Sequence, residues 1–212
     1  MNTPQRGRFV TIEGIEGVGK STHLARLVRR IEAAGHKVHI TREPGGTPTA
    51  ERIRDVVLGH AAEPVPGMAE LLLMFAARSL LVSNVIRPAL DAGTWVISDR
   101  FVDASRAYQG GGRGVPAERI ETLATWVLEG LRPDLTLLLD APVATGMART
   151  DSRGDPDRLD SEQADFYARV RERYLELAAA EPDRFVVVDA SGTLLDVQDE
   201  IDRVASSLLA HS

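Results

Sequence analysis

The stretch Gly14-Ile15-Glu16-Gly17-Val18-Gly19-Lys20-Ser21 fits a phosphate-binding pattern of glycine, four residues and Gly-Lys-Ser. Glycine permits positive φ angles and brings backbone N–H groups close to phosphate oxygens. In this pattern Lys20 reaches the β- and γ-phosphates of a nucleoside triphosphate, and the Ser21 hydroxyl binds Mg²⁺. The alternative is a glycine-rich connection that binds nothing. We expect an ATP-binding loop that ends at Thr22.

The residues on either side of this loop support that interpretation. The apolar run 9–12 comes directly before it and has the character of a strand. Apolar residues recur at helical spacing after it, and Gly35 stands where a helix typically ends. A strand before the loop and a helix after it are the context that the phosphate-binding pattern requires.

Composition restricts the class of protein. The 212 residues, 43% of them hydrophobic, can bury a substantial core, and we expect a single domain over residues 1–212. The absence of cysteine excludes disulfides and thiolate sites, and the five histidines show no metal-ligand spacing. A formal net charge of −6 argues against broad affinity for nucleic acid or membrane surfaces. No apolar run approaches the roughly twenty residues of a membrane span. A cytoplasmic protein is expected.

Short apolar runs alternate with longer segments of helical periodicity. The runs are apolar on successive residues, as in parallel strands covered on both faces. Strands are expected at 9–13, 38–41, 95–99, 135–140 and 185–189, and helices at about 21–34, 49–58, 67–90, 116–131, 161–180 and 194–210. This order predicts an open, three-layer α/β domain whose ligands bind beyond the carboxyl ends of the strands.

Two segments at strand ends carry charged residues. The run 41–47 combines Arg42, Glu43 and Pro44 with two glycines, and Arg54 follows on the next expected helix. Such a run is either a turn or an arginine-lined phosphate site, and its chemistry does not decide between them. Asp99 and Arg100 end the third expected strand, where a carboxylate can orient Mg²⁺ and an arginine can hold an acceptor phosphate.

Three further segments are candidates for substrate contact. Phe75 and Arg78 share one face of the long helix, so core packing and a stacked base are both possible there. The glycine-dense run 108–114, preceded by Ser105, reads as a flexible or sharply turned loop in which Tyr108 and Gln109 close on a substrate. A later segment rich in Gly, Pro and Asp has the composition of either a solvated surface or a mobile lid. Its arginines are Arg149, Arg153 and Arg158.

These motifs together make the sequence resemble the bacterial thymidylate kinases (dTMP kinases) over nearly its whole length. The phosphate loop alone would indicate only a large superfamily, whereas its combination with 42–47, 99–101, 108–114 and 132–136 is specific. The resemblance implies the P-loop NTPase fold with a five-stranded parallel sheet and a lid at about 149–160. It also implies a homodimer and Mg²⁺-dependent transfer of the ATP γ-phosphoryl group to dTMP.

The resemblance also implies roles for individual residues. Glu16 matches the carboxylate for the deoxyribose 3′-hydroxyl, and Tyr108 matches the tyrosine near the sugar. The acceptor phosphate is assigned to Arg42, Arg54 and Arg100, within a dTMP site that also includes Glu43 and Pro44. The thymine contacts are assigned to Phe75, Arg78, Ser105 and Gln109. Lys20, Arg100 and Arg153 are the expected catalytic residues, and Ser21 and Asp99 the expected metal ligands.

The sequence departs from the family at two points. Many members place the stacking phenylalanine four residues before the arginine, where this chain has Met74, whereas Phe75 lies three residues before it. We assign stacking to Phe75 and keep Met74 as the alternative. The phosphate loop also lacks an arginine found in some members, so Arg153 of the lid is expected to supply that charge.

Two other functions remain open on sequence alone. A kinase for another small acceptor would share the phosphate loop and the lid, and only the acceptor-site residues argue against it. A switch GTPase or regulatory ATPase is disfavoured because the chain has no Asn-Lys-x-Asp guanine signature.

Overall fold

The computed structural model describes residues 6–59, 63–151 and 162–210. Five parallel strands form one sheet in the order β2-β3-β1-β4-β5. The strands are β1 (Phe9–Glu13), β2 (Val38–Arg42), β3 (Trp95–Asp99), β4 (Leu135–Asp140) and β5 (Phe185–Asp189). All five expected strands are confirmed, with β2 one residue longer than predicted.

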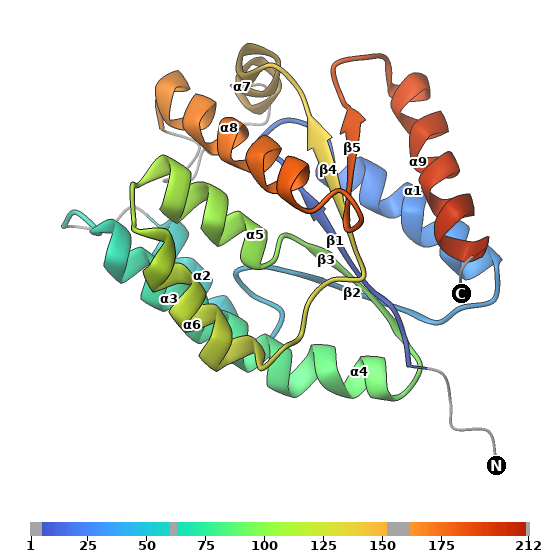
Figure 1. Ribbon diagram of the computed structural model, residues 1–212, viewed down its shortest axis with the longest axis horizontal. Helices are drawn as coiled ribbons and strands as arrows, with labels where there is room; N and C mark the ends of the chain where they lie inside the picture. Colours follow the sequence, from blue (N-terminus) through green and yellow to red (C-terminus); the bar gives the residue numbers. More distant parts are fainter. Residues whose placement is uncertain (1–5, 60–62, 152–161, 211–212) are drawn as a thin grey trace.

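Helices cover both faces of this sheet, giving three layers (Figure 1). Helices α1 (Lys20–Ala33) and α9 (Leu194–Ala210) lie side by side on one face. The other face carries α3 (Gly67–Leu81), α6 (Ala117–Leu128) and α8 (Ala164–Ala180), with α2 (Pro48–Leu58) packed against α3. The three-layer α/β class and the helices expected in these six regions are confirmed.

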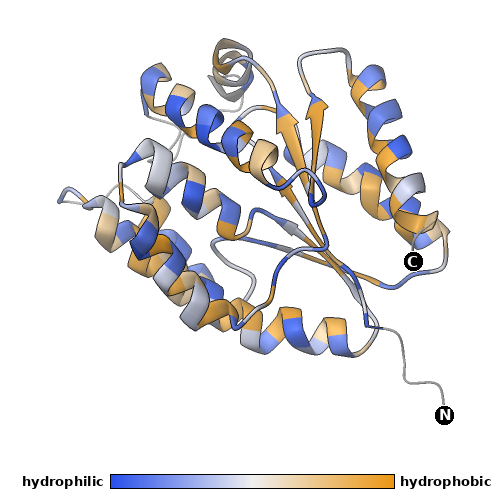
Figure 2. Ribbon diagram, viewed as in Figure 1, coloured by the Kyte–Doolittle hydropathy of each residue, from blue (hydrophilic) through white to orange (hydrophobic). Residues whose placement is uncertain are grey.

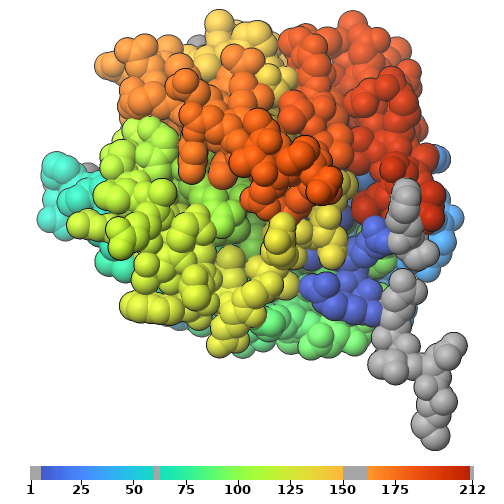
Figure 3. All heavy atoms as spheres, in the orientation of Figure 1, coloured from blue at the N-terminus to red at the C-terminus, as the bar shows by residue number. Residues whose placement is uncertain are grey.

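Apolar side chains concentrate between the layers. Strands β4 and β5 are largely hydrophobic in Figure 2, and the helices carry their polar residues on the outside. In the space-filling view, side chains of α6, α8 and α9 hide most of the sheet (Figure 3). Strand β1 is buried along its whole length, which fits its central place.

The edge strands differ from expectation. Ile40 of β2 is 52% exposed and Val187 of β5 is 46% exposed. Coverage on both faces, which the apolar runs predicted for every strand, is therefore wrong at the two edges. An edge strand has one neighbour only, and the flanking helices do not extend over these side chains.

The long helix expected at 67–90 is continuous but not uniform. It comprises α3, a π-helical turn η1 (Val82–Ile86) and α4 (Arg87–Asp91). These 25 residues are long and apolar enough to cross a membrane, and half of the apolar window is buried inside the protein. The sequence predicted the helix but showed no uninterrupted apolar run of that length, because polar residues interrupt it. A core helix passes the same test, so the finding is weak evidence for a membrane span.

Two expected loops contain helices. The glycine-dense run 108–114 falls largely within η2 (Arg106–Gly112), a π-helical segment that continues from α5 (Val102–Ser105). The prediction of a flexible or sharply turned loop is wrong there, because the glycines serve close packing. A Cβ on Gly112 would lie 2.4 Å from the Phe166 ring of α8. The second helix, α7 (Val143–Asp151), was not expected.

Candidate active site

The phosphate loop connects the carboxyl end of β1 to α1. Gly14, Gly17 and Gly19 all have positive φ, at 137°, 74° and 90°. At Gly17 there is also no room for a side chain, since a Cβ would lie 1.9 Å from the Gly146 carbonyl oxygen of α7. The glycines thus give the loop its path and let α7 pack against it.

Lys20 folds back over this loop. Its Nζ donates to the carbonyl oxygens of Gly14 at 3.2 Å and of Ile15 at 2.9 Å. Burial lowers the pKa of Lys20 to about 8, and the positive charge of Arg100 adds to the effect. A bound anion would offset the effects of burial and of Arg100 on this pKa, so Lys20 is placed to bind a phosphate.

Arg100 lies at the centre of the charged end of the site. It has a φ of 73°, an uncommon value for a residue other than glycine. Its Nη2 donates to Glu16 Oε1 at 2.7 Å and to the Tyr108 hydroxyl at 2.9 Å, and its Nη1 donates to the Gly14 carbonyl at 2.9 Å. Tyr108 also donates a short hydrogen bond to Glu16.

The charge state of Glu16 follows from these contacts. Burial alone would raise the pKa of Glu16, but the charges of Arg100 and Lys20 and the hydrogen bond from Tyr108 lower it overall. The carboxylate is therefore ionised at neutral pH and balances Arg100.

Glu13 is a further polar residue of the site, and the sequence analysis missed it. This fully buried side chain, at the end of β1, accepts hydrogen bonds from the Phe101 N–H at 2.7 Å and from the Tyr174 hydroxyl at 2.6 Å. Burial raises the pKa of Glu13 to about 8, and the negative charge of Asp103 contributes. Its position beside the phosphate loop was the available signal. Glu13 anchors the backbone directly after Arg100.

The expected metal ligands are suitable oxygen donors. Ser21 is the second residue of α1 and is exposed, and Asp99 ends β3 opposite Ile12 of β1. The Oδ1 atom of Asp99 is buried without a hydrogen-bond partner among the described residues. Those residues hold no cluster of three or more His, Asp or Glu side chains able to bind a metal alone. A hydroxyl, a carboxylate, phosphate oxygens and water are a ligand set that suits Mg²⁺.

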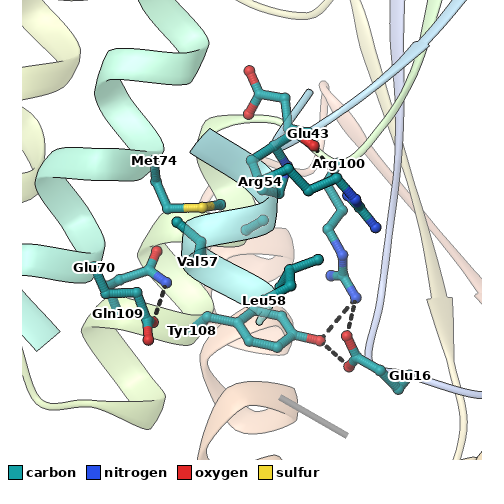
Figure 4. Close-up of a pocket in the computed structure, with 12 residues that line it drawn as sticks. Glu16, Glu43, Arg54, Val57, Leu58, Glu70, Met74, Arg100, Tyr108 and Gln109 are labelled. Atoms are coloured by element: carbon teal, nitrogen blue, oxygen red, sulfur yellow. Dashed lines mark hydrogen bonds and ion pairs between the residues drawn. The ribbon is translucent and has the colours of Figure 1, made fainter. Parts of the chain in front are cut away.

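A pocket of about 500 Å³, partly open to solvent, adjoins the phosphate loop. Glu16, Arg54, Arg100 and Tyr108 lie toward one end of it in Figure 4, and Glu70, Met74 and Gln109 toward the other. Glu43, Pro44, Val57, Leu58 and Ala104 complete the lining.

The end of this pocket near Glu70 and Gln109 presents an unused hydrogen-bonding atom. The Gln109 Nε2 atom donates to Glu70 Oε1 at 2.8 Å, while Gln109 Oε1 has no partner among the described residues. Ser105 Oγ and Arg78 Nη1 are likewise buried and without partners in that part of the chain, but neither residue lines the pocket. Because buried polar atoms are normally hydrogen-bonded, the Gln109 oxygen in the pocket wall points to a ligand.

Phe75 and Arg78 are in contact with each other. The guanidinium of Arg78 lies 4.5 Å from the Phe75 ring centroid, and Phe75 is 2% exposed within the core. Arg78 also forms a fully buried ion pair with Glu43 at 2.6 Å and donates to the Phe101 carbonyl at 3.0 Å. Phe75 does not line the pocket, whereas Met74 does. Of the two candidates for stacking, the one that faces the pocket is therefore Met74, the alternative from the sequence.

The arginines of the second candidate segment are separated. Arg54 lines the pocket and donates to the Pro44 carbonyl at 3.0 Å. Arg42 does not line it and pairs with Glu51 at 2.9 Å on the surface. The segment thus forms a bend and one wall of the pocket, and the phosphate site that the sequence offered as an alternative stays a prediction.

The lid residues are only partly described. Arg149 lies on α7 and donates to the Ala190 carbonyl at 3.1 Å. Arg153 and Arg158 lie outside the described residues.

A phosphate loop at the end of the central strand, beside a pocket with arginines at one end, is the arrangement of P-loop nucleoside monophosphate kinases, a class of phosphotransferases. The sequence model for thymidylate kinase matches residues 12–201, so the chain belongs to the thymidylate kinase family.

Individual relatives agree with that family. The thymidylate kinase of Methylococcus capsulatus is 54% identical over 204 residues, covering 96% of this chain and 97% of the relative. That of Ralstonia nicotianae is 50% identical, covering 95% and 99%. The crystal structure of thymidylate kinase from Ehrlichia chaffeensis superposes with a TM-score of 0.77 at 28% identity, covering 96% and 99%.

Proposed function

We propose that this protein transfers the γ-phosphoryl group of ATP to dTMP, giving dTDP and ADP in the biosynthesis of dTTP. The observation that carries the proposal is the pocket beside the phosphate loop, with arginines at one end and, at the other, a Gln109 oxygen that has no partner among the described residues. One monophosphate nucleotide would use both ends at once.

The base-edge atoms suit thymine. Thymine presents an N–H donor at N3 beside a carbonyl acceptor at O4. Within the described residues, Gln109 Oε1 is an acceptor and Arg78 Nη1 a donor without a partner, and one of each is what that edge requires. Met74 supplies an apolar surface for the ring, and Ser105 Oγ offers one further hydrogen bond.

The charged end suits a deoxyribose phosphate. In this proposal Glu16 accepts from the sugar 3′-hydroxyl, and Tyr108 packs near the sugar. Arg100 and Arg54 hold the acceptor phosphate, since guanidinium groups bind phosphate by paired hydrogen bonds. Arg42 joins them only if its surface ion pair with Glu51 opens.

On the donor side, residues 14–22 bind the ATP phosphates, with Lys20 on the β- and γ-phosphates. Ser21 and Asp99 hold Mg²⁺, which screens the phosphate charge when bound. A cation from the lid, for which Arg153 is the candidate, completes the donor site. The protein aligns donor and acceptor and excludes water. A general base is unnecessary, because a phosphate monoester oxygen is already largely ionised at neutral pH.

The assembly that we propose is a homodimer of single-domain chains. Val56 of α2, Leu72 of α3 and Trp126 of α6 are large apolar side chains that are at least half exposed. Their helices are neighbours, α2 against α3 and α3 against α6. An exposed apolar surface of this kind favours burial against a second copy. We expect a cytoplasmic enzyme with small-molecule substrates and no nucleic-acid or membrane partner.

Incubation with ATP, Mg²⁺ and a panel of nucleoside monophosphates tests this function. Preferential formation of dTDP is expected. Preference for another monophosphate would retain the kinase class and change the substrate, and hydrolysis of nucleoside triphosphate with no acceptor used would indicate a switch or regulatory NTPase.

A further inference from the structure

A buried carboxylate lies directly beside the glutamine of the pocket. Gln109 Nε2 donates a 2.8 Å hydrogen bond to Glu70 Oε1, and neither residue is appreciably exposed. Figure 4 shows the two side chains next to each other near Met74, at the end of the pocket remote from Glu16. Glu70 comes from α3 and Gln109 from η2. One end of the amide is thereby held, and its oxygen has no partner in the part of the chain that the structure describes.

This contact fixes which end of the amide is available to a ligand. The oxygen and the NH₂ group of a glutamine side chain have nearly the same shape, so hydrogen bonds decide its orientation. Glu70 is also the acidic partner of Arg113, whose Nη2 lies 3.5 Å from Glu70 Oε2. An ionised carboxylate accepts hydrogen bonds and donates none. Glu70 therefore retains the Gln109 NH₂ group. In a flipped amide the Gln109 oxygen would face the Glu70 oxygen, and two acceptors would then lie together in a buried site.

We propose that Glu70 is a positioning residue that sets the base specificity of the acceptor pocket by holding the Gln109 oxygen toward the base. This inference rests on the proposed function. A pyrimidine with an N–H at N3, such as thymine or uracil, donates to that oxygen. Cytosine has an unprotonated N3, so its lone pair faces the same oxygen and repels it. Glu70 thus selects against cytosine and does not distinguish thymine from uracil.

The test compares dissociation constants of dTMP, dUMP and dCMP, measured by calorimetry on the full-length protein. In Glu70→Gln the side chain at position 70 can both donate and accept a hydrogen bond, so the Gln109 amide can bind it in either orientation. The ratio of the dCMP constant to the dTMP constant is expected to fall at least about tenfold, the effect of relieving one buried hydrogen-bond mismatch. The ratio of the dUMP constant to the dTMP constant is expected to stay within about twofold of its wild-type value, since both bases present the same N3–H and O4 edge to Gln109.

Arg113→Gln is the matched control. It removes the cation of the ion pair and leaves the Glu70–Gln109 hydrogen bond in place, so discrimination against dCMP is expected to persist. Equal loss of discrimination in both variants would overturn the inference, because the ratio would then follow the charge of the ion pair instead of the amide orientation.

Glu70→Asp provides a second route if Glu70→Gln does not fold. The shorter side chain keeps the negative charge beside Arg113 and moves the carboxylate away from Gln109, so a partial loss of discrimination is expected. Wild-type ratios in whichever variant folds would overturn the role of Glu70 while dTMP binding by the wild type upheld the proposed function. A wild-type protein that does not bind dTMP would overturn both.

Discussion

The guanidinium of Arg78 covers one face of the Phe75 ring, at 4.5 Å from the ring centroid. The ring is therefore held in the core by a cation that itself pairs with Glu43. Because successive residues of a helix are rotated by about 100°, the neighbouring side chain, Met74, points into the pocket instead.

This relationship predicts different outcomes for two adjacent substitutions. Phe75→Ala should reduce the free energy of unfolding by about 3–5 kcal/mol, as expected for a large buried ring. Met74→Ala should weaken dTMP binding with a smaller loss of stability. Denaturant unfolding and calorimetric titration of both variants measure the two effects. Loss of dTMP affinity without loss of stability in Phe75→Ala would return the stacking role to Phe75.

Lys20 is expected to matter for turnover and little for folding. Lys20→Ala removes the only cation of the phosphate-loop pattern, so kcat should fall by at least about 10²-fold, as for loss of a transition-state charge contact. The melting temperature should change little, and the exposed Lys37→Ala is the matched control. Unchanged turnover in Lys20→Ala would remove the donor site from this loop.

Glu13 predicts a pH dependence of stability. Its pKa is raised from 4.5 to about 8, so the folded state binds the proton more tightly than the unfolded state. Its stabilising contribution is complete below pH 4.5 and is lost as the pH rises through 8. The free energy of unfolding should therefore fall over this window, by at most about 1.4 kcal/mol per pH unit from one proton.

Glu13→Gln remains neutral and should lack that part of the slope. Urea unfolding between about pH 5 and pH 8 compares the variant with the wild type, since the shift in pKa acts across this range. The exposed Glu32→Gln is the control and should keep the wild-type slope. Equal slopes for Glu13→Gln and the wild type would show that Glu13 does not gain a proton on folding.

Arg153 is expected to complete the donor site. Developing charge is greatest in the transition state, so Arg153→Ala should lower kcat by about 10³- to 10⁵-fold, the range for arginine fingers, with little change in dTMP affinity. Arg149→Ala and Arg158→Ala, at the other two arginines of the expected lid, are the necessary controls. Loss in one of these with normal turnover in Arg153→Ala would move the role to that residue, and three near-normal variants would remove it from the lid.

The proposed dimer is tested at Trp126, which is 71% exposed. Trp126→Asp places a charge on the apolar surface of α2, α3 and α6, and burying an unpaired charge at an interface is costly. Analytical ultracentrifugation should show a dimer for the wild type and a monomer for the variant. A wild-type monomer at micromolar concentration would contradict the assembly.

The sequence by itself determined the strands, the main helices and the phosphate loop. Their signals are local: apolar runs, helical periodicity, and glycines spaced around a lysine and a serine. The class and the family followed from motifs read in order along the chain. The sequence also offered Met74 and Phe75 as alternatives for contact with the base. Which of these adjacent side chains faces the pocket depends on how α3 is rotated against its neighbours, and the local pattern does not contain that rotation.

Only the tertiary structure decided the pairing of side chains distant in sequence. Glu70 and Gln109 are 39 residues apart, and the Glu13 carboxylate and the Tyr174 hydroxyl that it binds are 161 apart. The glycines of η2 read as flexible in the sequence, yet they are required because α8 packs against them. Packing between elements brings such groups together and removes them from water, which sets their hydrogen bonds and the raised pKa of Glu13. No single stretch of sequence carries that information, because it arises from two stretches in contact.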